Sequence, residues 1–344
     1  MSPRGVTGLH SWKLRALEER IPLAVHLELT HECSLRCPFC YNHSSENTTP
    51  LNLSEWESVL DDLRSIGTLL VTLTGGDPLK HPDFLEIAQA ARHRHLAVKI
   101  FTNGMLIDRP MADAIASLPP LQVELSIHGA GPEIHDRTTG VDGSYSTLRR
   151  AIDLLRERNI EVALRMPLST INQSEFVRVI EHSRKEAIPL LVDPMITVKD
   201  NRDRAPLRFQ ADGEAVRSLF GLLAETGDVP TTDRRLGDIN CGLGSITLAV
   251  DPAGWVFPCL QWRHSSMGNI REQGLKTIWE ESPVRSEATD VARKANDHLV
   301  GLGGSPASYP FCPAEAILRE GDPIRPSRQF FELAAAAAEA RSQA

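Results

Sequence analysis

A regular alternation of short apolar runs with longer amphipathic segments, between residues 23 and 196, constrains the fold more than any other feature. The short runs have the length of strands, and several are rich in Val, Ile and Leu, as in strands buried on both faces. The longer segments have the periodicity of helices. Successive strand–helix units predict a parallel sheet with right-handed crossovers. The expected strands are Leu23–Leu29, Leu69–Thr74, Leu96–Phe101, Leu121–Ile127, Ile160–Met166 and Pro189–Ile196.

Polar residues at the starts of the amphipathic segments predict where the helices begin. Ser54 is expected to cap a first helix, because Glu57 three residues later completes a capping box. Ser144 is expected to head a second helix, and Asn172 or Ser174 to cap a third. This pattern fits an open doubly wound sheet and a barrel equally well, so the architecture depends on what the loops carry.

The pattern changes after residue 200, where a charged segment with Pro206 predicts a linker. Residues 245–259 alternate like two strands around an Asp-Pro-Ala-Gly turn, which predicts a hairpin. The Gly- and Pro-rich residues 299–313 predict an irregular loop. Helices are expected at 214–226, 275–281 and 330–344. We therefore divide the chain into an N-terminal extension (1–22), a strand–helix region (23–200), a linker and helix (201–236), a hairpin region (237–325) and a C-terminal helix (326–344).

The composition narrows the classes of partner. The net charge is −8 and aromatic residues make up 5%, whereas surfaces that bind nucleic acid are normally basic and rich in stacking aromatics. No run approaches the roughly 18 consecutive apolar residues of a membrane span, and the N-terminus lacks the apolar middle of a signal peptide. We therefore expect a cytoplasmic protein that binds neither nucleic acid nor a membrane.

The placement of the cysteines gives the strongest chemical signal. In a long cytosolic chain, cysteines are more often metal ligands or catalytic groups than disulfide partners. Three thiolates spaced CxxxCxxC after a strand can hold three irons of an iron–sulfur cluster and leave the fourth iron open to another molecule. A zinc site and buried structural cysteines are the alternatives. The six cysteines form a first triad (Cys33, Cys37 and Cys40) and a second triad (Cys241, Cys259 and Cys312).

With Phe39 and Tyr41 beside its cysteines, the first triad resembles the signature of the radical S-adenosylmethionine (SAM) superfamily. The segment VTLTGGDPLKHPDF resembles the glycine-rich motif that follows the second strand in that family and binds the amino group of SAM. Gly75 and Gly76 would let the backbone approach the ligand, and the carboxylate of Asp77 suits an ammonium group. The family usually has Glu where Asp77 stands, but a carboxyl acceptor is retained.

The next two loops continue the resemblance. The segment IFTNGMLID implies that Thr102 and Asn103 face the cofactor. The segment ELSIHGAGPEIHDRTTG implies that Ser126 and Arg137 hold the carboxylate of SAM, for which a guanidinium is a natural partner.

Three further residues in these loops have open roles. Arg165, at the end of the fifth expected strand, is expected to contact the cofactor or to form a packing ion pair. For His128 and His135, structural hydrogen bonding is the favoured interpretation. All these segments follow strands, and active sites of parallel barrels assemble at the carboxyl ends of strands. The resemblance therefore implies an α/β fold, a partial (β/α)6 TIM-type barrel, with a small C-terminal β-hairpin and helix region for an auxiliary cluster.

The C-terminal third resembles the SPASM or twitch extension of radical SAM enzymes. A full SPASM region carries seven cysteines and two clusters, whereas the second triad supports at most one auxiliary 4Fe-4S cluster. His264, Asp238 and Glu315 are candidate fourth ligands, and a zinc site or a lost cluster is the alternative. The matching positions besides the cysteines are Gly242, Gly254, Gly268, Asn269 and Trp279.

The resemblance implies reductive cleavage of SAM to a 5′-deoxyadenosyl radical, which abstracts a hydrogen atom from a substrate. The loop segments look most like maturases of ribosomally synthesised peptides, so a side-chain cross-link in a precursor peptide is expected. Alternatives are a dehydrogenase or decarboxylase of a small molecule, a peptide epimerase and a non-catalytic scaffold. The implied partners are a precursor peptide and a flavodoxin- or ferredoxin-type electron donor. Because only about twenty residues precede the first expected strand, leader recognition would need the barrel face, the C-terminal region or a separate leader-recognition protein.

Overall fold

The computed structural model describes residues 15–42 and 49–343, so most of the expected N-terminal extension lies outside the described residues. Nine strands form one sheet in the order β6-β5-β4-β3-β2-β1-β7-β8-β9. The first six strands in the chain are parallel to their neighbours, which confirms the strand–helix prediction. The strands are β1 (Ala24–Thr30), β2 (Leu70–Gly75), β3 (Ala97–Thr102), β4 (Gln122–Ser126), β5 (Val162–Pro167), β6 (Leu190–Asp193), β7 (Thr247–Val250), β8 (Trp255–Phe257) and β9 (Gly268–Asn269).

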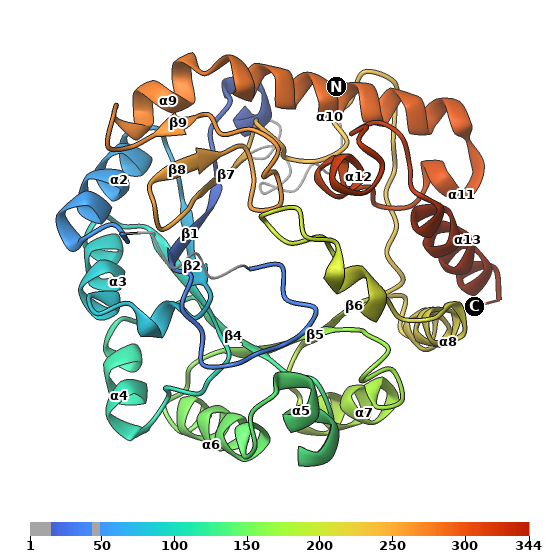
Figure 1. Cartoon of the computed structure of the whole chain (residues 1–344), viewed down its shortest axis with the longest axis horizontal. Coiled ribbons are helices and arrows are strands. Elements are labelled where there is room, and N and C mark those ends of the chain that lie inside the picture. Colours follow the sequence, from blue (N-terminus) through green and yellow to red (C-terminus); the bar gives the residue numbers. More distant parts are fainter. Residues whose placement is uncertain (1–14, 43–48, 344) are drawn as a thin grey trace, which may run out of the picture.

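Helices surround the outside of this curved sheet, as Figure 1 shows. The strand faces that meet the helices are apolar; on β1 this face presents Val25, Leu27 and Leu29, all fully buried. A 3-10 turn, η1 (Pro78–Lys80), follows β2. The helices of the strand–helix region are α2 (Leu53–Ser65), α3 (Phe84–His93), α4 (Arg109–Ser117), α5 (Pro132–Thr139), α6 (Ser144–Arg156) and α7 (Phe176–Glu186).

The other face of the barrel strands is polar. The parallel register aligns His26 of β1 with Thr72 of β2 and then with Lys99 of β3. It also aligns Ser126 of β4 with Arg165 of β5. Because successive strand residues point to opposite faces, these side chains share the inner face of the curved sheet. The strands therefore alternate between an apolar outer face and a polar inner face and are not apolar on both faces as expected.

Two predicted helix caps are wrong. The cap of α2 is Asn52, whose side chain accepts from the Glu55 backbone N–H at 3.1 Å, while the Asn52 N–H donates to the Glu55 carboxylate at 2.8 Å. Ser54 lies inside the helix and donates its hydroxyl to the Asn52 side chain. The capping box is therefore real but starts two residues earlier, because Asn52 is an equally good cap.

The helix α7 begins after Glu175, and neither Asn172 nor Ser174 caps it. The Asn172 side chain instead accepts from the Ser169 N–H at 2.8 Å and donates to the Pro167 carbonyl at 3.0 Å. It therefore fixes the turn after β5, a local use of Asn that competes with helix capping.

The C-terminal region extends the same sheet. Strand β7 pairs with β1 in parallel, and β7 and β8 form the predicted antiparallel hairpin. The expected helices at 214–226, 275–281 and 330–344 are confirmed as α8 (Gly213–Ala224), α9 (Leu275–Glu281) and α13 (Arg328–Gln343). In the described part of the chain, no helix is both long enough and apolar enough to cross a bilayer.

The predicted irregular loop at 299–313 is partly wrong. A helix, α10 (Pro283–Leu302), runs through its first residues, and α11 (Gly304–Ala307) follows before α12 (Pro313–Glu320). Ala288, Ala292 and Leu299 are buried on one face of α10, so a helical period was present in the sequence before the Gly-rich segment. The glycines end the helix at Gly303, which has φ of 66°.

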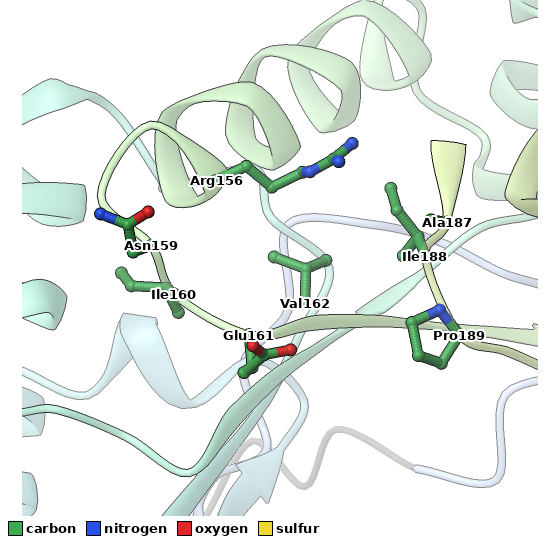
Figure 2. Close-up of a pocket in the computed structure, with 8 residues that line it drawn as sticks. All are labelled: Arg156, Asn159, Ile160, Glu161, Val162, Ala187, Ile188 and Pro189. Atoms are coloured by element: carbon green, nitrogen blue, oxygen red, sulfur yellow. The ribbon is translucent and has the colours of Figure 1, made fainter. Parts of the chain in front are cut away.

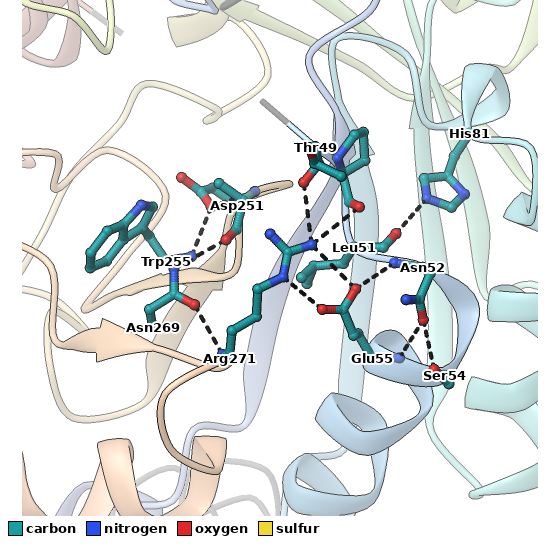
Figure 3. A network of polar contacts seen from close by, with 12 residues as sticks. Thr49, Leu51, Asn52, Ser54, Glu55, His81, Asp251, Trp255, Asn269 and Arg271 are labelled. Atoms are coloured by element: carbon teal, nitrogen blue, oxygen red, sulfur yellow. Dashed lines mark hydrogen bonds and ion pairs between the residues drawn. The ribbon is translucent and has the colours of Figure 1, made fainter. Parts of the chain in front are cut away.

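The hairpin region is tied to the strand–helix region by the network in Figure 3. The Arg271 guanidinium pairs with the Glu55 carboxylate at 2.6 Å and donates to the Thr49 and Pro50 carbonyls at 3.3 Å each. The Leu51 N–H donates to the Pro252 carbonyl at 2.8 Å. The start of α2 is thus held by residues about two hundred positions away in the chain.

Candidate functional site

The first triad lies on the loop that follows β1. Its thiols are free, and that of Cys33 belongs to an exposed residue. The Cys40 N–H donates to the Cys37 carbonyl at 3.2 Å, which makes a tight turn. Burial, together with the neighbouring thiols of the triad, raises the pKa of Cys37 and raises that of Cys40 to about 11. The three sulfurs are therefore close enough to interact electrostatically.

Hydrogen-bond donors from the predicted cofactor loops approach these sulfurs. The Asn103 side-chain amide donates to the Cys33 sulfur at 3.4 Å, and the Leu35 N–H donates to the same atom at 3.4 Å. The His128 Nε2 lies 4.0 Å from the Cys37 sulfur. Such donors stabilise thiolate charge and tune the clusters that thiolates hold. The predicted loop after β3 thus reaches the first triad through Asn103.

Gly75 and Gly76 are required by backbone packing. A Cβ on Gly75, which has φ of +128°, would stand 2.3 Å from the Thr30 carbonyl oxygen, and one on Gly76 would stand 2.3 Å from the Glu32 carbonyl oxygen. The Gly76 and Asp77 N–H groups donate to these same two carbonyls, at 2.7 and 2.8 Å. The glycines therefore let the end of β2 lie directly on the cysteine loop, a role that the sequence had assigned to ligand approach.

Asp77 is a buried carboxylate with one oxygen satisfied and one not. Its Oδ1 accepts from the Thr102 hydroxyl at 2.8 Å and from the Leu79 N–H at 3.2 Å. Its Oδ2 is buried and has no hydrogen-bond partner among the described residues. Burial raises the pKa of Asp77 to about 6. A buried carboxylate oxygen in this state suits a cationic donor such as an ammonium group.

Arg165 forms the packing ion pair that was one of its two expected roles. Its guanidinium pairs with the Glu124 carboxylate and lies 5.6 Å from the centroid of the Phe101 ring. Lys99 pairs with the same carboxylate at 3.0 Å. Two cations on the inner barrel face thus share the buried Glu124 carboxylate. One of them, Arg165, lies opposite Ser126 in the register of β4 and β5.

Arg137 and the two histidines lie on or beside α5. Arg137 donates to the Ile171 carbonyl at 3.1 Å, so its guanidinium rests on the loop after β5. The His128 N–H donates to the His135 Nδ1 at 3.1 Å, which is the structural hydrogen bond that the sequence favoured. Burial lowers the pKa of His128 to about 3 and that of His135 to about 4, so both rings are neutral.

The second triad is assembled from three separate elements. Cys241 precedes β7, Cys259 follows β8, and Cys312 is the residue before the first turn of α12. Burial, together with the nearby Cys241 thiol, raises the pKa of Cys259 to about 11 and raises that of Cys312. The side chains of Cys259 and Cys312 pack against a small separate core made of Leu243, Trp262, Ala288, Ala292 and Ala314.

The three candidate fourth ligands differ in their surroundings. Glu315 follows Cys312 on α12 and is buried, but its carboxylate pairs with Arg319. The His264 ring packs against the Trp262 ring with centroids 5.9 Å apart, and the Asp238 N–H donates to the Arg235 carbonyl. In residues 15–42 and 49–343, no three His, Cys, Asp or Glu side chains are arranged to hold one metal ion. A 4Fe-4S cluster does not need three ligands around one ion, because each of its ligands binds a separate iron.

A buried ion pair that the sequence reasoning missed joins the two halves of this site. The Glu28 carboxylate on β1 pairs with the Arg263 guanidinium, which follows Cys259. The Tyr41 hydroxyl donates to the same carboxylate at 3.3 Å. A lone Glu inside the apolar strand AVHLELT was the available signal, since carboxylates are rarely buried without a partner.

A cavity of about 290 Å³ lies away from both triads, at the amino ends of β5 and β6 (Figure 2). It is lined by residues before β5 and before β6, including Glu161 and Pro189. Because the cysteine loop leaves the carboxyl end of β1, this cavity is on the other side of the barrel from the first triad.

Known proteins match this arrangement. Residues 27–182 match the Radical SAM superfamily, and residues 241–302 match SPASM, an iron–sulfur cluster-binding domain. The chain is 27% identical over 331 residues to a PqqA peptide cyclase of Ruegeria pomeroyi, covering 88% of this chain and 85% of that protein. It is 25% identical over 308 residues to an Fe-coproporphyrin III synthase of Methanosarcina barkeri, covering 79% and 76%.

Among solved structures, Streptococcus suis SuiB bound to its precursor peptide SuiA superposes with a TM-score of 0.63 at 14% identity, covering 83% of this chain and 74% of that one. This likeness shows the fold. The expected fold, family and enzyme class are thus confirmed: the chain is a radical SAM enzyme with a SPASM-type C-terminal extension.

Proposed function

We propose that this chain is a peptide maturase that uses a SAM-derived radical to cross-link side chains of a ribosomally synthesised precursor peptide. The observation that carries the proposal is the buried, partnerless Oδ2 of Asp77 next to a loop with three free thiols. A soft thiolate set suits an iron–sulfur cluster, and a lone carboxylate oxygen beside it suits the ammonium of SAM.

Several residues would bind and orient the cofactors. Cys33, Cys37 and Cys40 would hold a 4Fe-4S cluster, which with SAM supplies a 5′-deoxyadenosyl radical. Asp77 would receive the SAM ammonium, while Thr102 keeps its other oxygen engaged at 2.8 Å. The remaining residues proposed to line the SAM site are Gly75, Gly76, Asn103, Ser126, Arg137 and Arg165.

The second triad would hold one auxiliary 4Fe-4S cluster. Its three thiols are free and interact electrostatically, which supports a shared cluster. Its own part in the reaction would be to accept the electron released after bond formation or to position the substrate. Six free cysteines in one chain also support a reducing, cytoplasmic setting.

The precursor peptide is the proposed substrate because relatives carry names of peptide-modifying enzymes, among them the PqqA peptide cyclase. SuiB, which shares the fold, has been crystallised with its precursor peptide. A flavodoxin- or ferredoxin-type protein would supply the electron, and a separate protein would recognise the leader.

Small-molecule chemistry is the second candidate, since one relative is an Fe-coproporphyrin III synthase. The rival reaction is decarboxylation or dehydrogenation of a small molecule. Peptide epimerisation ranks below cross-linking, because it needs a thiol hydrogen donor and both triads assign all six cysteines to clusters.

The test incubates anaerobically reconstituted enzyme, SAM and dithionite with short peptides encoded beside its gene. Cross-linking predicts a product that has lost two hydrogens and resists exopeptidase digestion at the linked residues. Deuterium uptake from D2O without a change in composition would indicate epimerisation instead. Loss of CO2 from a tetrapyrrole carboxylate, with no change in any peptide, would favour the small-molecule reaction and contradict the proposal.

A further inference from the structure

A buried ion pair lies between the two cysteine regions and takes no part in the chemistry proposed above. The Glu28 side chain is 1% exposed and the Arg263 side chain is 6% exposed. The Arg263 guanidinium also lies over the Phe257 ring, 4.5 Å from its centroid. A buried pair of this kind gives little net stability, so its presence calls for another explanation.

The pair touches the first triad through Tyr41. Tyr41 directly follows Cys40, and its hydroxyl donates to the Glu28 carboxylate at 3.3 Å. The Tyr41 carbonyl accepts from the Asp200 N–H at 2.9 Å. The charges of Glu28 and the Cys40 thiol both act on the Tyr41 hydroxyl, so these groups are electrostatic neighbours.

The same pair touches the second region through Arg263 itself. Arg263 follows Cys259 in the loop after β8, and Phe257 beneath it precedes Cys259 in the hairpin. The Asp200 carboxyl adds to Glu28 in stabilising the positive charge of Arg263, whereas burial raises the pKa of Tyr41 and keeps its hydroxyl neutral. One cation from the C-terminal region is thus surrounded by acidic groups next to the first triad.

We propose that Arg263 and Glu28 are a positioning pair through which the C-terminal region sets the reduction potential of the cluster at Cys33, Cys37 and Cys40. This inference rests on the proposed function, because it requires a cluster at the first triad. Reduction adds negative charge to the cluster. A nearby guanidinium therefore favours the reduced state and a nearby carboxylate disfavours it, an effect that low exposure to water strengthens.

The test isolates the first cluster in the full chain. In the C241A/C259A/C312A background, the reduction potential is measured by a redox titration followed by electron paramagnetic resonance. R263Q is expected to lower the potential, and E28Q to raise it. The R263Q/E28Q double variant is expected to return close to the parent, and R263K, which keeps the charge, to stay close to it.

A control and a second readout separate electrostatics from misfolding. R271Q removes the exposed pair between Arg271 and Glu55, which also joins the two regions, and is expected to leave the potential unchanged. If R263Q fails to fold, E28Q is compared with the parent, which reads the loss of the carboxylate charge, and with the double variant, which reads the loss of the guanidinium charge. Thermal unfolding of each variant without its cluster identifies such failures.

Two results would overturn the inference. Shifts of R263Q and E28Q in the same direction would show that disruption, and not charge, moves the potential. No shift in either variant would show that the pair does not act on the cluster. A parent protein that assembles no cluster at the first triad would overturn the proposed function as well, whereas a normal cluster with unmoved potential leaves the proposed function intact.

Discussion

The two cysteine triads are built in opposite ways. The three cysteines of the first triad lie within eight consecutive positions, 33–40, on one loop. The second spans positions 241–312 and depends on a hairpin, a helix start and a small core of its own. A local site is specified by the spacing of its residues, whereas a dispersed site exists only once the surrounding chain has folded. The comparison predicts that the two sites respond differently to the same kind of change.

What holds each triad in place differs as well. The cysteine loop is fixed by backbone hydrogen bonds: the Gly76 and Asp77 N–H groups donate to carbonyls at the end of β1 and just after it, and the Arg36 N–H donates to the Thr139 carbonyl at 2.8 Å. Cys259 and Cys312 of the second triad pack against apolar side chains, among them Trp262 and Ala292. We therefore expect side-chain substitutions in the small core to affect the second triad and spare the first.

The largest expected effect comes from removing the first triad. In C33A/C37A/C40A, SAM cleavage should fall to background, at least about a thousandfold, because the cofactors and not protein acids carry this chemistry. Iron content should fall by about four atoms per chain, the content of one cubane cluster. Quantified 5′-deoxyadenosine and iron per chain give the answer. Retained SAM cleavage in this variant would show that the first triad is not the site of cleavage.

The next effect separates the two triads. In C241A/C259A/C312A, iron should again fall by about four atoms per chain, but SAM cleavage should persist because the first triad is intact. Cross-linked product should drop by at least about a hundredfold, because the released electron has lost its acceptor. The ratio of product to 5′-deoxyadenosine is the measurement. Equal loss of both would mean that the triads act as one unit.

The small core offers a sharper test of the same difference. Trp262 is 2% exposed, and W262A should reduce the free energy of unfolding of the C-terminal region by about 3–5 kcal/mol. Chemical denaturation followed by fluorescence reports this loss. Iron at the second triad should fall while SAM cleavage is retained. W255A, at a tryptophan that is 41% exposed on the same hairpin, is the matched control and should change stability little.

The smallest expected effect concerns Asp77. Its pKa rises from 3.8 in the unfolded chain to about 6 in the fold, so folding disfavours its ionised form. Because of this raised pKa, the contribution of Asp77 to the free energy of unfolding is fully present below pH 3.8 and is lost as the pH rises to about 6. In metal-free protein, D77N should remove this loss, a gain of about 3 kcal/mol at pH 7.

Urea denaturation at pH 4 and pH 7 measures how the free energy of unfolding depends on pH. Wild type and D77N should differ by about 2 kcal/mol more at pH 7 than at pH 4. An unchanged difference would mean that Asp77 is not strained by burial. D77N should also weaken SAM binding in the reconstituted enzyme, which links the stability cost of this carboxylate to its proposed ligand.

Local patterns predicted local features well. The six strands, the hairpin and the first triad follow from spacing alone, because residues close in sequence fix them. The cap at Ser54 failed by two positions because Asn52 and Ser54 are both good caps and each has a Glu three residues later, so the sequence alone does not decide between them. The helix α10 was missed because Gly- and Pro-rich residues beyond Leu302 obscured its end.

Features that depend on distant contacts could not be predicted. Glu28 and Arg263 lie 235 positions apart in the chain, and no local sequence pattern around either residue indicates that they form a pair. Gly75 and Gly76 were recognised, but the reason for them, contact with the Thr30 and Glu32 carbonyls, appears only in the folded chain. The partnerless oxygen of Asp77 likewise depends on which groups burial brings to it.

The most direct test of the central claim is electron paramagnetic resonance of the reduced C241A/C259A/C312A variant, recorded with and without SAM. The account predicts the signal of a single 4Fe-4S cluster, with g values that change when SAM occupies the open iron. A spectrum unaltered by SAM, or a first triad that holds zinc after anaerobic reconstitution with iron and sulfide, would contradict it.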